Sequence, residues 1–84
     1  MAATRGDIER WLRQAKREGD THVIVVCDPM DYDAFPVSVR PGEDPRKRVA
    51  EINASGNRVM EVYALHLGIE RQLNEHRAFH YEGP

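Results

Sequence analysis

Five consecutive apolar residues, from Val23 to Cys27, stand out in the pattern of hydrophobic and polar positions, and most of them are β-branched. A run this short that is apolar on both faces is typical of a strand buried on both sides. Asp28 and Pro29 end it, because proline lacks the N–H that a β ladder needs. We therefore predict a central strand over residues 21–28.

Two further strands are predicted. Apolar and polar residues alternate strictly from Phe35 to Arg40, which indicates a half-buried strand, and Pro36 places that strand at a sheet edge. The short loop over residues 29–34 favours an antiparallel hairpin with the central strand. The segment from Arg58 to Leu65 is rich in β-branched and aromatic residues, which favours a strand over the beginning of a longer helix.

Apolar stripes with helical spacing predict three helices. Thr4 and Asp7 have the spacing of a capping box at the start of the first. Asp44 followed by Pro45 is a favoured start for the second. The predicted helices cover residues 5–17, Pro45 to the 53–56 segment, and 68–78.

The resulting order is helix, strand, strand, helix, strand, helix, in a single domain over residues 1–84. We predict an α+β fold with a small three-stranded mixed sheet in the order 2-1-3 and the helices packed on the sheet. This order places the strand that is apolar on both faces in the middle, and a crossover of the third strand past the first is expected to be right-handed.

Composition excludes several classes of protein. The net charge of −2 argues against nucleic-acid binding through a broad basic face. The single cysteine, Cys27, permits no internal disulfide, which favours a reducing, cytoplasmic setting. No segment resembles a signal peptide or a membrane span, so no membrane contact is expected. A chain of 84 residues has a thin core, and self-association into a homo-oligomer would bury more of its surface.

The predicted hairpin loop combines acidic residues with methionine and aromatic residues, a mixture that suits a contact surface for a protein partner. The same carboxylates could instead bind a hard cation, although their spacing fits no EF-hand, or could simply hydrogen-bond the backbone of the loop. The candidate partner-binding residues are Asp28, Met30, Asp31, Tyr32, Asp33 and Phe35.

A second candidate site surrounds the third predicted strand. If Glu61 points inward, it needs a cationic partner, because an unpaired buried carboxylate is costly; otherwise it faces water. Arginine side chains there could also bind the phosphate of a nucleotide. The candidate ligand-binding residues are Arg58, Glu61, Tyr63, Arg71 and Arg77.

No arrangement typical of a catalytic site is present, and no cofactor is expected. His76 and His80 would share a helical face if the last helix extended that far, which could suit zinc, but lone histidine pairs are more often solvated. His22 and His66 flank predicted strands and have no evident role. Cys27, at the end of an apolar strand, is more typical of a core residue than of a nucleophile.

Four segments together resemble a family of short, uncharacterised proteins from actinobacterial phages and prophages. They run from Thr21 to Asp28, Asp31 to Val37, Asn57 to Leu65 and Gln72 to Phe79. The resemblance implies no catalytic residue. It implies a small phage protein that acts in the cytoplasm of a bacterial host.

These observations support three hypotheses. In the first, the chain is a non-enzymatic binding protein that engages and inhibits a host bacterial protein, in host takeover or anti-defence. In the second, it is a sponge that sequesters a cyclic nucleotide in a pocket at a subunit junction, with Arg58, Arg71 or Arg77 as the ligand-binding cation. The weakest is a metal-dependent enzyme that uses the loop aspartates or the histidine pair.

Overall fold

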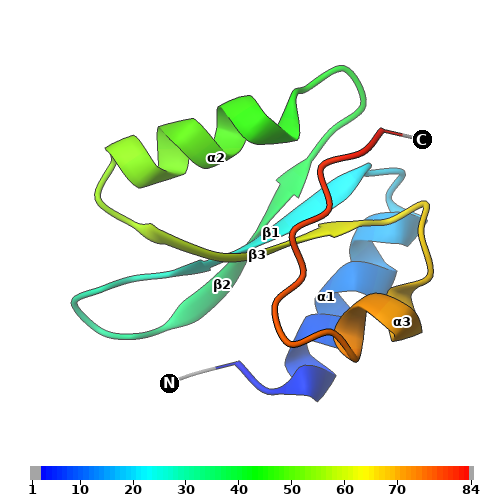
Figure 1. Cartoon of the computed structure of the whole chain (residues 1–84), viewed down its shortest axis with the longest axis horizontal. Coiled ribbons are helices and arrows are strands. Elements are labelled where there is room, and N and C mark those ends of the chain that lie inside the picture. The colour runs from blue at the N-terminus through cyan, green and yellow to red at the C-terminus, as the bar shows by residue number, and fades with distance from the viewer. Residues whose placement is uncertain (1–2, 84) are drawn as a thin grey trace.

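The computed structural model describes residues 3–83 and confirms the predicted α+β fold and its order of elements (Figure 1). The segment from Arg58 is a strand, as its composition favoured. The elements are α1 (Arg5–Arg17), β1 (His22–Cys27), β2 (Ala34–Val39), α2 (Pro45–Ala54), β3 (Arg58–Ala64) and α3 (Ile69–Leu73).

The sheet has the predicted order β2-β1-β3, with the strand that is apolar on both faces in the middle. It differs from the prediction in being antiparallel at both pairings rather than mixed. The crossover through α2 does connect strands that run the same way, but β1 lies between them. β2 and β3 therefore run in the same direction but do not pair with each other.

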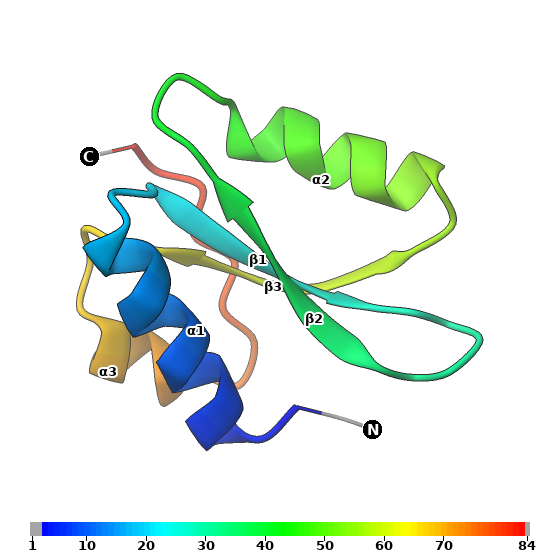
Figure 2. The ribbon, with the colours of Figure 1, turned by 180° about the vertical axis from the view of Figure 1, so that it is seen from behind.

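The two faces of the sheet hold separate apolar clusters, with α1 and α2 lying on opposite faces (Figures 1 and 2). On one face α1 packs Leu12 and Ala15 against Val23 and Val25. On the other face α2 packs Ile52 against a cluster that includes β1, β2 and β3 residues. The central strand contributes to both clusters, which is the physical reason for its unbroken apolar run.

Local sequence signals set the ends of α1 as predicted. The Thr4 hydroxyl accepts a hydrogen bond from Asp7 N–H, and the Asp7 carboxylate accepts one from Thr4 N–H, which completes the capping box. These bonds hold the pKa of Asp7 below its ordinary value. Gly19 follows the helix with φ of 84°, a conformation that glycine adopts without strain.

The last helix is much shorter than predicted, because α3 ends at Leu73 rather than near Ala78. The Arg5 guanidinium donates to Leu73 O at 3.1 Å and to Asn74 Oδ1 at 2.6 Å. A side chain of α1 therefore hydrogen-bonds the carbonyl of the last residue of α3. Residues after Asn74 then leave the helix and pair with β3, which no pattern in their own sequence predicts.

The chain from residue 74 to 83 lies along the outer edge of β3 and across the sheet face that α2 covers (Figure 1). Val62 N–H donates to Ala78 O at 2.8 Å, and His80 N–H donates to Val62 O at 3.0 Å. Tyr81 packs on the α2-side cluster, with the Arg46 guanidinium 4.2 Å above its ring. The C-terminal segment therefore folds back on the sheet through Tyr81, whereas Phe79 stays exposed.

The opposite edge of the sheet, along β2, carries Pro36 at its middle. Asp28 N–H donates to Asp33 O, so Asp28 and Asp33 form a hydrogen-bonded pair. Hydrogen-bonded and non-hydrogen-bonded pairs alternate along an antiparallel ladder, which makes Val26 and Phe35 the next hydrogen-bonded pair. Pro36, paired with Val25, therefore turns its backbone nitrogen outward. A proline in this position removes a donor from the open edge and hinders pairing with another strand.

Candidate functional site

The loop between β1 and β2 is held in a defined shape by Asp28. The backbone N–H of Asp28 donates to Asp33 O at 2.9 Å, and Tyr32 N–H donates to Asp28 O at 2.7 Å. The carboxylate of Asp28 accepts a hydrogen bond from Met30 N–H at 2.8 Å. Asp28 therefore orders the loop, as an aspartate in a turn commonly does.

This ordering presents two large side chains to solvent. Met30 is 85% exposed and Tyr32 is 72% exposed. Tyr32 has φ of 59°, in the left-handed region that a bulky residue adopts only at a cost. Strain of this kind at an exposed aromatic residue is characteristic of functional positions, because a glycine or asparagine there would satisfy the backbone better.

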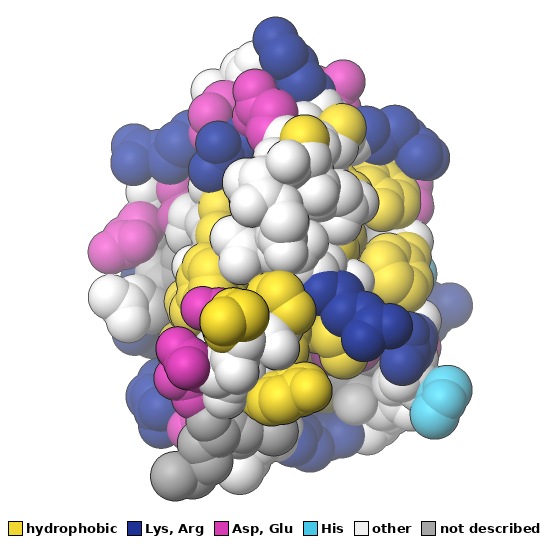
Figure 3. All heavy atoms as spheres, turned by 90° about the vertical axis from the view of Figure 1, so that its left-hand side faces the viewer, with side chains coloured by type: hydrophobic (Ala, Val, Ile, Leu, Met, Phe, Trp, Pro, Cys, Tyr) yellow, Lys and Arg dark blue, Asp and Glu magenta, His cyan; other side chains and the backbone are white. Residues whose placement is uncertain are grey.

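The end of the molecule that carries this loop has further apolar surface. Figure 3 shows this end, with hydrophobic side chains on the middle and right of the surface and both acidic and basic side chains around them. Phe35, on β2, is 38% exposed. This exposure is greater than expected for a residue on the predicted buried face of that strand. Asp31 and Asp33 are exposed in the loop itself. The geometry thus brings the predicted partner-binding residues to one end of the molecule.

A cavity of about 150 Å³ adjoins the loop on the α1 side of the sheet. Its walls are mostly apolar, and the acidic side chain among them is Glu61. The thiol of Cys27 also borders it and donates to Asp28 O at 3.6 Å, so Cys27 is partly buried rather than a full core residue. The lining residues are Ala3, Ile8, Val25, Cys27, Tyr32, Ala34, Met60 and Glu61.

Glu61 does not have the arginine partner that the sequence suggested. Its Oε2 atom accepts a hydrogen bond from Ala78 N–H at 3.2 Å, and its carboxylate interacts with the phenol of Tyr63. No ion pair joins it to another residue within 3–83. The backbone of the C-terminal segment satisfies this half-buried carboxylate, which a local sequence pattern could not indicate.

Burial, followed by the hydrogen bond to Glu61, raises the pKa of Tyr63 well above its ordinary value of 10.0. The neutral phenol is the form that the fold stabilises, so this contribution is complete below about pH 10 and is lost as the pH rises through the folded-state pKa. We expect the free energy of unfolding to fall above about pH 10, by up to about 1.4 kcal/mol per pH unit for this proton.

Urea denaturation across this pH range, with wild type and Tyr63→Phe in parallel, measures the effect. Tyr63→Phe should show a shallower decline, because no phenol remains to ionise. Equal slopes in the two proteins would contradict the assignment.

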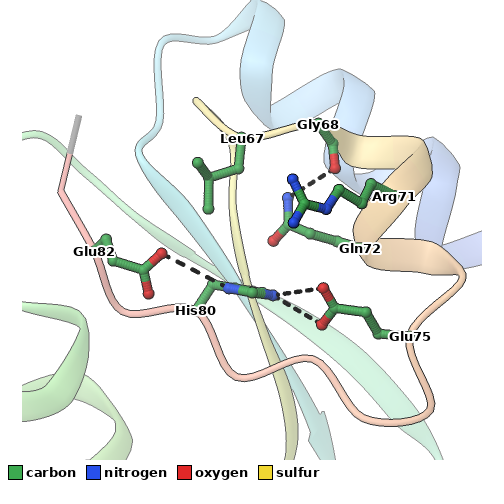
Figure 4. Close-up of a pocket in the computed structure, with 7 residues that line it drawn as sticks. All are labelled: Leu67, Gly68, Arg71, Gln72, Glu75, His80 and Glu82. Carbon is green, nitrogen blue, oxygen red and sulfur yellow. Dashed lines mark hydrogen bonds and ion pairs between the residues drawn. The ribbon is translucent and has the colours of Figure 1, made fainter.

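The three candidate arginines do not form one pocket. Arg58 lies at the start of β3 opposite Cys27, whereas Arg71 lies on α3 and Arg77 in the segment after it. A cavity of about 240 Å³ beside α3 includes Arg71 in its wall but neither of the other two (Figure 4). The phosphate pocket was expected at a subunit junction, which a single chain does not contain, so that pocket stays a prediction.

The predicted histidine pair is also not assembled, because α3 ends before His76. His80 instead lies between two carboxylates, with Nε2 at 2.8 Å from Glu75 and Nδ1 at 3.7 Å from Glu82 (Figure 4). Within residues 3–83, no group of three or more histidine, cysteine or acidic side chains is arranged to hold a metal ion.

His22 and Gln72 are among the buried polar residues that the sequence did not predict. His22, expected to have no particular role, is 1% exposed and its Nε2 atom lies 2.8 Å from Glu82 O. A carbonyl can only accept, so this ring nitrogen carries the proton. The Gln72 amide is also buried, and it donates to Ala64 O at 2.8 Å and accepts from Ala64 N–H at 2.9 Å. Both side chains hydrogen-bond to backbone groups of other segments, and the residues next to them in the sequence do not indicate these bonds.

Comparisons with known proteins supply no relative: no protein-family model, no curated protein and no solved structure matches this chain. In the part of the chain that is described, none of the helices combines the length and apolar character that crossing a bilayer requires.

Proposed function

We propose that this chain is a small, non-enzymatic binding protein that engages a bacterial host protein through the end of the molecule that carries the β1–β2 loop, and thereby inhibits it. The observation that supports this most is the strained, exposed Tyr32 beside the exposed Met30. A loop that is already ordered loses little conformational entropy on binding, so its exposed side chains can contribute most of their contact energy to affinity. The host context rests on the resemblance to phage proteins.

The surface has the composition of a protein contact. Aromatic and methionine side chains are enriched at the centres of interfaces, and charged side chains surround them. The loop presents Met30 and Tyr32 with Asp31 between them. The alternative of a cyclic-nucleotide sponge is not the one that we favour, because it needs a pocket at a subunit junction, and the cavity that contains Arg71 in one chain contains neither Arg58 nor Arg77.

Replacing Met30 by serine tests the proposal. Met30 is 85% exposed and makes no packing contact with either core cluster, so the variant should unfold within about 0.5 kcal/mol of wild type. Immobilised wild-type protein is expected to capture a specific protein from bacterial lysate, identified by mass spectrometry, and Met30→Ser should capture at least several-fold less of it.

Phe79→Ser provides the matched control, because Phe79 is also an exposed hydrophobic residue but lies on the C-terminal segment. It should capture as much as wild type. Equal capture by Met30→Ser and wild type would overturn the proposed binding surface.

A further inference from the structure

We propose that the cavity beside the β1–β2 loop is an anchor pocket for one lysine or arginine side chain of the partner. This inference rests on the proposed function and specifies the chemistry of the partner. The features that support it are the size of the cavity, its apolar walls and the single carboxylate within them.

The size of the cavity favours a side chain over a small-molecule ligand. Its volume is about 150 Å³, whereas pockets for nucleotide-sized or drug-sized ligands usually exceed about 300 Å³. The apolar walls come from three elements, with Ile8 on α1, Val25 on β1 and Met60 on β3. An extended aliphatic stem would bury its methylene groups against these walls.

The carboxylate of Glu61 decides the charge of the occupant. Glu61 belongs to the cavity wall and has no cationic partner among the described residues, although Ala78 N–H donates to it. A purely apolar occupant would displace water from this carboxylate without replacing the lost hydrogen bonds, and an anionic occupant would be repelled. A cationic head on an aliphatic stem satisfies both the walls and the carboxylate.

The mouth of the cavity favours the same occupant. Tyr32 lines it, and an aromatic ring can contact a cation through its face. Asp31, next to Tyr32, is exposed and adds negative potential near the entrance, which accelerates the approach of a basic partner. The strained position of Tyr32 therefore serves two purposes, because it exposes the ring and completes the wall of the pocket.

Small analogues of these side chains test the pocket directly. We would titrate isotope-labelled protein with n-butylammonium, n-butylguanidinium, n-butanol and butyrate, and follow the NMR signals of the Ile8, Val25 and Met60 methyl groups. The cationic probes should shift these signals in a saturable way and bind about ten-fold more tightly than n-butanol. Butyrate should bind least. Binding of n-butanol as tight as that of the cations would overturn the proposal.

Two substitutions locate the effect. Glu61→Gln keeps an oxygen that can accept from Ala78 N–H, and it should reduce the affinity for the cations to that for n-butanol. Ala34→Leu places a larger side chain in the cavity wall and should abolish the shifts from all the probes. Arg58→Ala is the matched control, since Arg58 lies opposite Cys27 outside the lining, and it should bind the cations at least as well as wild type. The amide spectra of all three variants report whether each remains folded, and a folded Glu61→Gln that still prefers cations contradicts the assignment.

Failure of this inference is distinguishable from failure of the proposed function. If the cationic probes show no preference while Met30→Ser still loses capture, the anchor pocket is wrong and the binding surface stands. If Met30→Ser captures as well as wild type, the binding surface is wrong, and so is the assignment of this pocket to a partner's side chain.

Discussion

Replacing Gln72 by leucine is expected to lower the free energy of unfolding by about 3 kcal/mol. The Gln72 amide takes the place of a fourth strand, because it both accepts from Ala64 N–H and donates to Ala64 O. It also donates to Gly68 O at 3.2 Å, which joins the sheet to the start of α3. Leucine is similar in size but leaves the buried N–H of Ala64 without a partner, which costs about 1–3 kcal/mol. Ala64 O keeps only the longer hydrogen bond from Leu67 N–H at 3.3 Å, and the donations of Gln72 to Ala64 O and Gly68 O are lost.

Arg71→Leu makes the same kind of change on the adjacent residue of α3 and is the matched control. The side chain of Arg71 is exposed and makes no hydrogen bond or ion pair with residues 3–83, so its substitution should change stability by less than about 0.5 kcal/mol. Urea denaturation followed by circular dichroism measures both variants. A stability of Gln72→Leu equal to that of Arg71→Leu would show that water, rather than the amide, satisfies Ala64.

Replacing Tyr32 by glycine is expected to separate stability from binding. Glycine adopts a φ near 59° without strain, so the variant should be more stable than wild type by about 0.5–1 kcal/mol. Binding of the partner should weaken by about 30-fold or more, because an exposed tyrosine at the centre of a contact commonly contributes at least about 2 kcal/mol. Few substitutions raise stability while removing a function, so this combination is diagnostic.

Asp31→Gly is the control for stability. Asp31 has no positive φ, so glycine at that position only adds flexibility to the unfolded chain, and the variant should be less stable than wild type. Thermal unfolding ranks the three proteins, and titration of the captured partner gives the affinities. If Tyr32→Gly lowers stability, the strain at Tyr32 is not the cost that we assign to it; if its affinity is unchanged, Tyr32 is not part of the contact.

The sequence predicted the loop site better than the ligand site. Met30, Tyr32 and Asp31 lie within a few residues of each other on a short hairpin, so their proximity follows from local structure. Arg58, Arg71 and Arg77 lie on different elements, and only the path of the chain decides whether they meet. The cavity was not predicted, because its walls combine residues from α1, the hairpin and β3.

The sequence by itself determined the order of the elements, the central place of β1 and the ends of α1 and α2. These features depend on local signals, which are the run of apolar residues, the capping side chains at Thr4 and Asp44, and Pro36 at an edge. Only the tertiary structure decided where α3 ends and what covers the outer edge of β3. Those features depend on unpaired backbone groups of β3 that must be satisfied once they are buried, and the Gln72 amide and the C-terminal segment reach them only after the chain has folded.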